Sequence, residues 1–135
     1  MRGFRAWHTK LNRYLKDDEF FIDADGKVRN DSFGRGNYEE AFDTSDFDNG
    51  YIILEQDTGL KDRNGKKIYE GDIVKFKWTK RLYVVTYRLY DASFILENDE
   101  WEETIHLSLD RDDFEVFGNI HMNPELLEEE NERER

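Results

Sequence analysis

Few side chains of this sequence have the types and spacing that catalysis or metal binding requires. His8, His106 and His121 lie far apart, and no His-Glu-x-x-His or His-x-His pair is present to hold a metal ion. No serine lies in a Gly-x-Ser-x-Gly turn. The sequence has no cysteine, which excludes thiolate nucleophiles, disulfides and Cys-ligated zinc. We therefore expect a protein that is not an enzyme and that uses no metal ion or cofactor.

Carboxylates are abundant, with 32 acidic side chains, so chance clusters are expected. Residues 23–26, Asp-Ala-Asp-Gly, resemble part of a calcium loop. With this glycine in the sixth position, Phe21 and Ser32 would stand where the loop needs its first and twelfth ligands, so the calcium interpretation fails. The acidic run 110–113 is interpreted as a solvated turn. The acids are numerous enough for a hydrolase that uses two carboxylates, but nothing in the sequence selects a pair. An enzyme, such as a metal-dependent hydrolase, is therefore only the third hypothesis.

Residues 60–90 hold nine basic and three acidic side chains, with aromatic residues between the basic ones. Such a mixture can neutralise phosphates and stack bases, so one hypothesis is a strip that binds nucleic acid. Its candidate members are Lys75, Lys77, Lys80, Arg81, Arg88 and Tyr90. The structural alternative is that the aromatic side chains fill a core while the lysines lie on the outer face of the same strands. The net charge of −12 argues against nucleic acid because it repels phosphate at long range.

The acidic segments suggest the opposite kind of surface. Carboxylates on neighbouring strands and turns can imitate the phosphates of a nucleic acid and so occupy the groove of an enzyme that binds nucleic acid. The candidate members of this acidic face are Glu97, Asp99, Glu100, Glu102, Glu103, Asp110, Asp112, Asp113 and Glu115. The simpler interpretation is that these charges keep the protein in solution.

The charge is distributed unevenly along the chain. The net charge is +5 over residues 1–16, −10 over 17–59, +6 over 60–90 and −13 over 91–135. This predicts basic patches in acidic surroundings, available for contacts within the molecule or with a partner. Aromatic residues make up 15% of the 135 residues, which supports one modest core. Neither a signal peptide nor a long apolar run is found, so we expect a cytoplasmic protein that does not contact a membrane.

Strand patterns dominate the predicted secondary structure. Asp-Gly at 25–26 and Asn-Gly at 49–50 and 64–65 each predict a two-residue hairpin turn. From residue 73 to 120, apolar and polar side chains alternate in five short segments joined by tight turns. The residues predicted to face the core are Val74, Phe76, Trp78, Tyr83, Val85, Tyr87, Leu89, Trp101, Ile105, Leu107, Leu109, Phe114, Val116 and Ile120. Five such strands favour a small SH3-like barrel, because closure removes exposed edges.

We predict a mainly β fold, of a β-rich α+β class, in three parts. Residues 1–59 would form an N-terminal β-hairpin subdomain with a loose acidic segment, 60–122 the SH3-like barrel, and 123–135 a short helix with an acidic tail. Asn123 is expected to cap this helix, with Pro124 in its first turn.

Four segments of the chain occur in an order and spacing that carry a family resemblance. They are Phe4-Arg5-Ala6-Trp7, then Thr58-Gly59-Leu60-Lys61-Asp62 with Asn64-Gly65-Lys66, then Ile68-Tyr69-Glu70-Gly71-Asp72-Ile73-Val74, and last Gly118-Asn119-Ile120 with Asn123-Pro124-Glu125-Leu126-Leu127. Together they resemble the YopX-like proteins of bacteriophages and prophages. The resemblance implies a β-rich fold with a small SH3-like barrel and a phage origin. It implies no established activity, so no catalytic residue follows from it, and the matching glycines and Asp72 are interpreted as turn residues.

These observations favour a non-enzymatic phage or prophage accessory protein that binds a host protein, for counter-defence or host takeover. The contact surface would be the charged face of the barrel, including the acidic face that imitates nucleic acid. The alternative is a nucleic-acid-binding module that uses the basic and aromatic strip. A homo-oligomer is a further hypothesis, because positive and negative segments could meet between copies.

Overall fold

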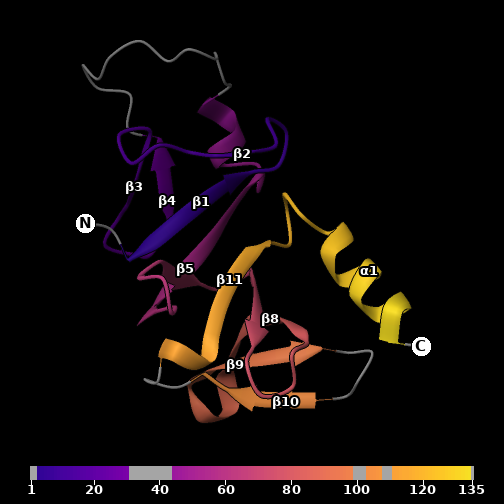
Figure 1. Ribbon diagram of the computed structural model, residues 1–135. Coiled ribbons are helices and arrows are strands. Elements are labelled where there is room, and N and C mark those ends of the chain that lie inside the picture. The colour runs from indigo at the N-terminus through magenta and orange to yellow at the C-terminus, as the bar shows by residue number, and fades with distance from the viewer. Residues whose placement is uncertain (1–2, 31–43, 99–102, 108–110, 135) are drawn as a thin grey trace. The chain divides into compact units, whose positions relative to one another are not determined.

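The computed structural model describes residues 3–30, 44–98, 103–107 and 111–134. The chain divides into two compact units, Met1–Glu55 and Gln56–Arg135 (Figure 1). The strands are β1 (Phe4–His8), β2 (Arg13–Tyr14), β3 (Phe20–Ile22), β4 (Val28–Asn30), β5 (Ile52–Lys61), β6 (Lys67–Tyr69), β7 (Asp72–Phe76), β8 (Leu82–Arg88), β9 (Ser93–Asn98), β10 (Glu103–His106) and β11 (Phe114–Asn119). The helices are α1 (Glu125–Glu134) and three 3₁₀ turns, η1 (Thr44–Phe47), η2 (Leu89–Asp91) and η3 (Arg111–Asp113).

The first unit is built from short antiparallel pairs. β1 is bonded to β2, with Trp7 opposite Tyr14, and also to β5. β3 and β4 form the hairpin predicted at Asp25-Gly26, where Gly26 has a φ of 80°. The core of this unit consists of Ala6, Leu15, Phe20, Val28 and Phe47.

The second unit contains a curled half-barrel sheet in the order β10-β9-β8-β7-β11, with antiparallel neighbours (Figure 1). Val74, Tyr83, Val85 and Phe114 are buried as the sequence predicts, but burial does not alternate strictly along β7 and β8, because Ile73 and Leu82 on the opposite face are buried as well. The buried residues of its core are Ile68, Val74, Tyr83, Val85, Leu96 and Phe114. Within the described residues, the mainly β fold with a short C-terminal helix is confirmed.

Two carboxylates close the turns that lead into this sheet. Asp62 begins the turn between β5 and β6, and its Oδ1 accepts hydrogen bonds of 2.9 Å from the backbone N–H groups of Asn64 and Lys66. This is the hairpin predicted at Asn64-Gly65. Asp72 caps its own turn, as expected, since its Oδ2 accepts a 2.8 Å hydrogen bond from the Tyr69 N–H.

Three local predictions are wrong. Asn49-Gly50 does not join two strands, because it follows η1 and precedes β5 in a turn closed by the Tyr51 N–H on the Asp46 carbonyl at 3.2 Å. Trp78 lies beyond the end of β7 and is 69% exposed, so strand alternation no longer determines its direction. Leu89 belongs to η2 and is 84% exposed for the same reason. Trp101 and Leu109 lie outside the described residues.

Helix α1 follows β11 after a short turn and packs against β8. The Asn123 carbonyl accepts a 3.1 Å hydrogen bond from the Leu126 N–H at the start of the helix. The Asn123 side chain instead points back to β11, where its Oδ1 accepts a 3.2 Å hydrogen bond from the Asn119 N–H. Among the described residues, no helix is long and apolar enough to cross a membrane.

Candidate functional site

A pocket of about 210 Å³ opens at one end of the half-barrel, within the second unit. Its lining combines side chains from both surfaces that the sequence singled out. They are Arg63, Lys75, Lys77, Lys80, Asp112, Asp113, Phe114 and Glu115. We call this the lysine pocket.

The pairing of β7 with β11 builds one wall of the lysine pocket. Lys75 lies directly opposite Glu115 in the register of these strands. Both side chains face away from the core, because the neighbouring Phe76 and Phe114 point inward and stack with ring centroids 5.5 Å apart. Phe114 is buried and also contributes to the lining, so the pocket has an apolar floor.

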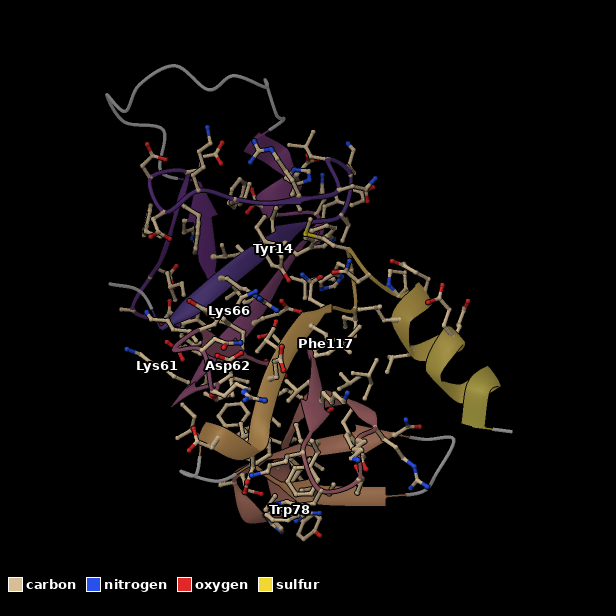
Figure 2. All side chains as sticks on the ribbon, in the orientation of Figure 1. Tyr14, Lys61, Asp62, Lys66, Trp78 and Phe117 are labelled. Atoms are coloured by element: carbon tan, nitrogen blue, oxygen red, sulfur yellow. The ribbon has the colours of Figure 1, made fainter. Side chains whose placement is uncertain are left out.

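The turn between β7 and β8 forms the other wall, and two backbone hydrogen bonds fix it. The Lys80 N–H donates to the Phe76 carbonyl at 2.8 Å, with Lys80 in the left-handed region at a φ of 60°. The Lys77 N–H donates to the Asp113 carbonyl at 2.8 Å, which fastens the turn to η3. This turn presents Trp78 to solvent at the end of the unit (Figure 2).

The carboxylates and the lysines of the lysine pocket differ in their partners. Asp113 Oδ1 accepts a 3.2 Å hydrogen bond from the Trp78 indole N–H, and Glu115 lies 3.9 Å from the Arg63 guanidinium. Within the part of the chain that the structure describes, Lys75, Lys77 and Lys80 form no ion pair within 4.0 Å. The ammonium groups of Lys77 and Lys75 lie 5.0 and 5.7 Å from the ring centroids of Trp78 and Phe117.

The predicted basic strip is distributed over both ends of β8. Lys75, Lys77 and Lys80 meet at the lysine pocket, and Arg81 follows directly. Arg88 ends β8, where its guanidinium lies 4.7 Å from the centroid of the Tyr90 ring and 3.2 Å from His106 Nε2. Because a seven-residue strand spans about 20 Å, the two groups of basic residues are separate surfaces.

The members of the predicted acidic face also lie in more than one place. Asp112, Asp113 and Glu115 line the lysine pocket. Glu97 is half-buried on β9, and Glu103 begins β10 opposite Asn98. The other four members, Asp99, Glu100, Glu102 and Asp110, fall outside the described residues.

Ion pairs with buried carboxylates stabilise the first unit. Glu55 Oε1 accepts hydrogen bonds of 2.8 Å from both Arg5 Nε and the Tyr14 hydroxyl. Glu19 accepts from both guanidinium nitrogens of Arg13, at 2.9 and 3.1 Å, and from the Lys16 N–H at 2.7 Å. Burial alone would raise the pKa of Glu19, but these hydrogen bonds outweigh it and hold the pKa below its ordinary value of 4.5.

Comparison with known proteins identifies the chain. The model of the YopX protein family matches residues 3–128. The chain belongs to the YopX family. A comparison with curated proteins finds no match. Among solved structures, protein EF1440 from Enterococcus faecalis is similar, with 32% identity, a TM-score of 0.60 and coverage of 93% of this chain and 96% of that one. Protein YopX from Bacillus subtilis shares the fold, with 20% identity, a TM-score of 0.50 and coverage of 91% and 95%.

The segments that carry the YopX resemblance form turns and close contacts rather than the lining of the lysine pocket. Asp62 and Lys66 belong to the β5–β6 hairpin (Figure 2). Gly118 lies against the side chain of Asn123. Within the described residues, no group of three His, Asp or Glu side chains is arranged to hold a metal ion.

Sequence reasoning names the lysines of the lysine pocket and places Trp78 among the aromatic residues between them, but it does not predict that Trp78 is exposed. It predicts Trp78 in the core, because it extends the alternation along β7 two residues too far. The residues Trp-Thr-Lys-Arg between two strands contain neither Gly nor Pro, so the turn lacks its usual signal. The exposure of Trp78 could be predicted only if the end of β7 were known.

Proposed function

We propose that this YopX-family protein is a non-enzymatic phage or prophage accessory protein, located in the bacterial cytoplasm, that binds a host protein. Counter-defence or host takeover is the purpose that suits such a protein. The proposal is carried by one observation, the exposed Trp78 beside the lysine pocket. Tryptophan is enriched among the residues that dominate binding energy at protein interfaces, and charged groups around it give specificity.

The lysine pocket supports this contact better than an acidic face that imitates nucleic acid. Such a face needs a row of carboxylates without intervening cations. Asp112, Asp113 and Glu115 instead share the pocket with three lysines and an arginine. We therefore place the contact with the partner at the lysine pocket and Trp78.

The proposal is tested by affinity capture from a lysate of the bacterium that carries the gene, with and without nuclease, followed by mass spectrometry. We expect a stoichiometric host protein that survives nuclease treatment and is lost with Trp78→Ala. Leu89→Ala is the matched control, because Leu89 is also apolar and exposed but belongs to η2 at the other end of β8. Failure of the wild-type protein to retain any host protein under gentle salt would remove the proposal.

Nucleic-acid binding is the second candidate, and it is favoured by the clustering of Lys75, Lys77 and Lys80 beside an aromatic ring. It predicts that changing these lysines and Arg81 to Glu abolishes binding to an oligonucleotide. Changing only one of these four residues should reduce the dependence of affinity on salt, because fewer counterions are released on binding. Unchanged oligonucleotide binding by the fourfold variant would exclude this surface.

A further inference from the structure

The lysine pocket contains positive charge that the described part of the chain does not neutralise. Two of its three carboxylates have other neighbours, since Asp113 accepts from Trp78 and Glu115 lies near Arg63. The ammonium groups of Lys75, Lys77 and Lys80 have no carboxylate within 4.0 Å among the described residues. A ligand that brings carboxylates therefore meets three available donors, whereas a cationic ligand would compete with Trp78 and Arg63 for two of the three acidic side chains.

We infer that the lysine pocket binds an acidic peptide segment of the partner, with carboxylates on Lys75, Lys77 and Lys80 and an apolar side chain against the exposed Trp78. This inference rests on the proposed function, because it names the chemistry of the partner at the same surface. Lys75 is on β7 and Lys77 follows the last residue of this strand, and both line the lysine pocket. An extended peptide places alternate side chains on one face, about 7 Å apart, so two acids at positions i and i+2 can reach both lysines.

The same geometry disfavours a nucleic-acid strand as the occupant. Three carboxylates line the lysine pocket and repel any anion, and this repulsion is greater for a continuous row of phosphates than for a peptide with only two acids, both of which lie on lysines. The Lys77 ammonium lies 5.0 Å from the centroid of the Trp78 ring, so it occupies one face of that ring, and a base that stacks has only the other face. A peptide can present its acids to the lysines and its backbone or apolar groups to the remaining wall.

The test uses the full chain and a defined probe, the peptide acetyl-Ser-Glu-Leu-Glu-Leu-Ser-amide. Binding is followed by the NMR signals of the Trp78 indole and of the pocket backbone amides. We expect saturable shifts that weaken with salt and that are absent with the matched peptide in which both Glu are Gln. In the triple variant Lys75→Gln, Lys77→Gln, Lys80→Gln, affinity for the Glu peptide should fall at least tenfold.

The matched control removes the same charge elsewhere in the second unit. Lys61→Gln, Lys66→Gln, Lys67→Gln changes three lysines of the β5–β6 hairpin that do not line the lysine pocket. This control should keep the affinity of the wild type. An equal loss of affinity in both variants would show that net charge alone explains the effect, and it would overturn the inference. A Glu peptide that does not bind would also overturn it. So would a thymidine oligonucleotide that binds more tightly than the Glu peptide.

Capture from lysate separates failure of the inference from failure of the proposed function. If a host protein is retained equally by the wild type and by the pocket triple variant, the inference is wrong while the protein-binding function stands. If the Glu peptide binds at the lysine pocket but no host protein is captured, the proposed function fails and the chemistry of the pocket remains supported.

Discussion

Asp62 and Val116, which are 54 residues apart in the sequence, are joined by a hydrogen bond of 2.9 Å from the Val116 N–H to Asp62 Oδ2. The next residue, Arg63, donates its backbone N–H to the Phe114 carbonyl at 2.9 Å. β11 is the last strand of its sheet, so these two bonds satisfy backbone groups that would otherwise lie open at a sheet edge. The same short segment therefore closes the β5–β6 hairpin and covers β11 beside the lysine pocket.

Replacing Asp62 with Asn should destabilise the second unit by about 1–3 kcal/mol. The Asp62 carboxylate is 1% exposed and accepts hydrogen bonds from three backbone N–H groups. An amide NH₂ cannot accept, so at least one buried donor loses its partner. If these amides exchange by opening of the whole unit, amide hydrogen exchange at Lys66 and Val116 should become about tenfold faster for each ~1.4 kcal/mol of stability that is lost.

Asp112→Asn is the control for this prediction, because Asp112 is exposed and its change should alter stability by less than about 0.5 kcal/mol. Equal exchange rates in the Asp62→Asn variant and the wild type would mean that Asp62 does not hold β11.

Replacing Gly118 with Ala should destabilise the connection between β11 and α1. A Cβ atom at this position would overlap Asn123 Oδ1 and would lie 2.7 Å from Asn123 Cγ. The Asn123 side chain would have to leave, which breaks its hydrogen bond with the Asn119 N–H. We expect a loss of about 1–3 kcal/mol, measured by urea unfolding.

A double-mutant cycle with Asn123→Ala tests the cause. Asn123→Ala removes the side-chain atoms that the added Cβ would overlap, so Gly118→Ala should cost clearly less in this background than alone. Additive effects would show that the contact between these two residues is not the reason for the loss.

The strands of the half-barrel could be predicted because their signal is local. Period-two alternation correctly places Val74, Tyr83 and Val85 inside, since each lies in the middle of a strand whose faces differ in polarity. It misplaces Trp78 and Leu89 because each lies just beyond the end of a strand, where the backbone changes direction without a Gly or Pro to mark it.

The buried charges could not be predicted, because their partners are distant in the sequence. Glu55 is buried with Arg5, 50 residues away, and no local pattern distinguishes it from the many exposed acids of this chain. The lysine pocket could not be predicted for the same reason, because its residues are distant in the sequence. The sequence places Lys75 and Glu115 on two different candidate surfaces, and only the antiparallel register of β7 and β11 makes them neighbours.

The Arg13–Glu19 pair should make the first unit less stable in acid. Hydrogen bonds from Arg13 and Lys16 hold the pKa of Glu19 below 4.5 despite burial. A lowered pKa stabilises the folded state above the ordinary value, and that contribution disappears as pH falls through the folded-state pKa. Compared with Glu19→Gln, the wild type should therefore be more stable by about 1.5–3 kcal/mol above pH 4.5.

Urea unfolding from about pH 7 to about pH 3, followed by NMR signals of the first-unit core, measures this difference. It should stay constant at neutral pH and shrink below pH 4.5, where protonated Glu19 becomes similar to Gln. In an Arg13→Gln background the advantage of Glu19 over Gln should be smaller above pH 4.5, where Glu19 is charged. A difference that grows as the pH falls would contradict the assigned direction of the pKa shift.

Trp78→Ala should leave the stability of the second unit within about 0.5 kcal/mol of the wild type. The ring is 69% exposed, and its hydrogen bond to Asp113 lies on the surface. Phe114→Ala provides the contrast, because Phe114 also lines the lysine pocket but is buried at the start of β11, so that its loss should cost about 3–5 kcal/mol. Thermal unfolding of the three proteins measures both effects. If Trp78→Ala lowers the stability as much as a core substitution does, the ring is part of the packing of the second unit. The loss of a captured partner in that variant would then result from unfolding rather than from a lost contact.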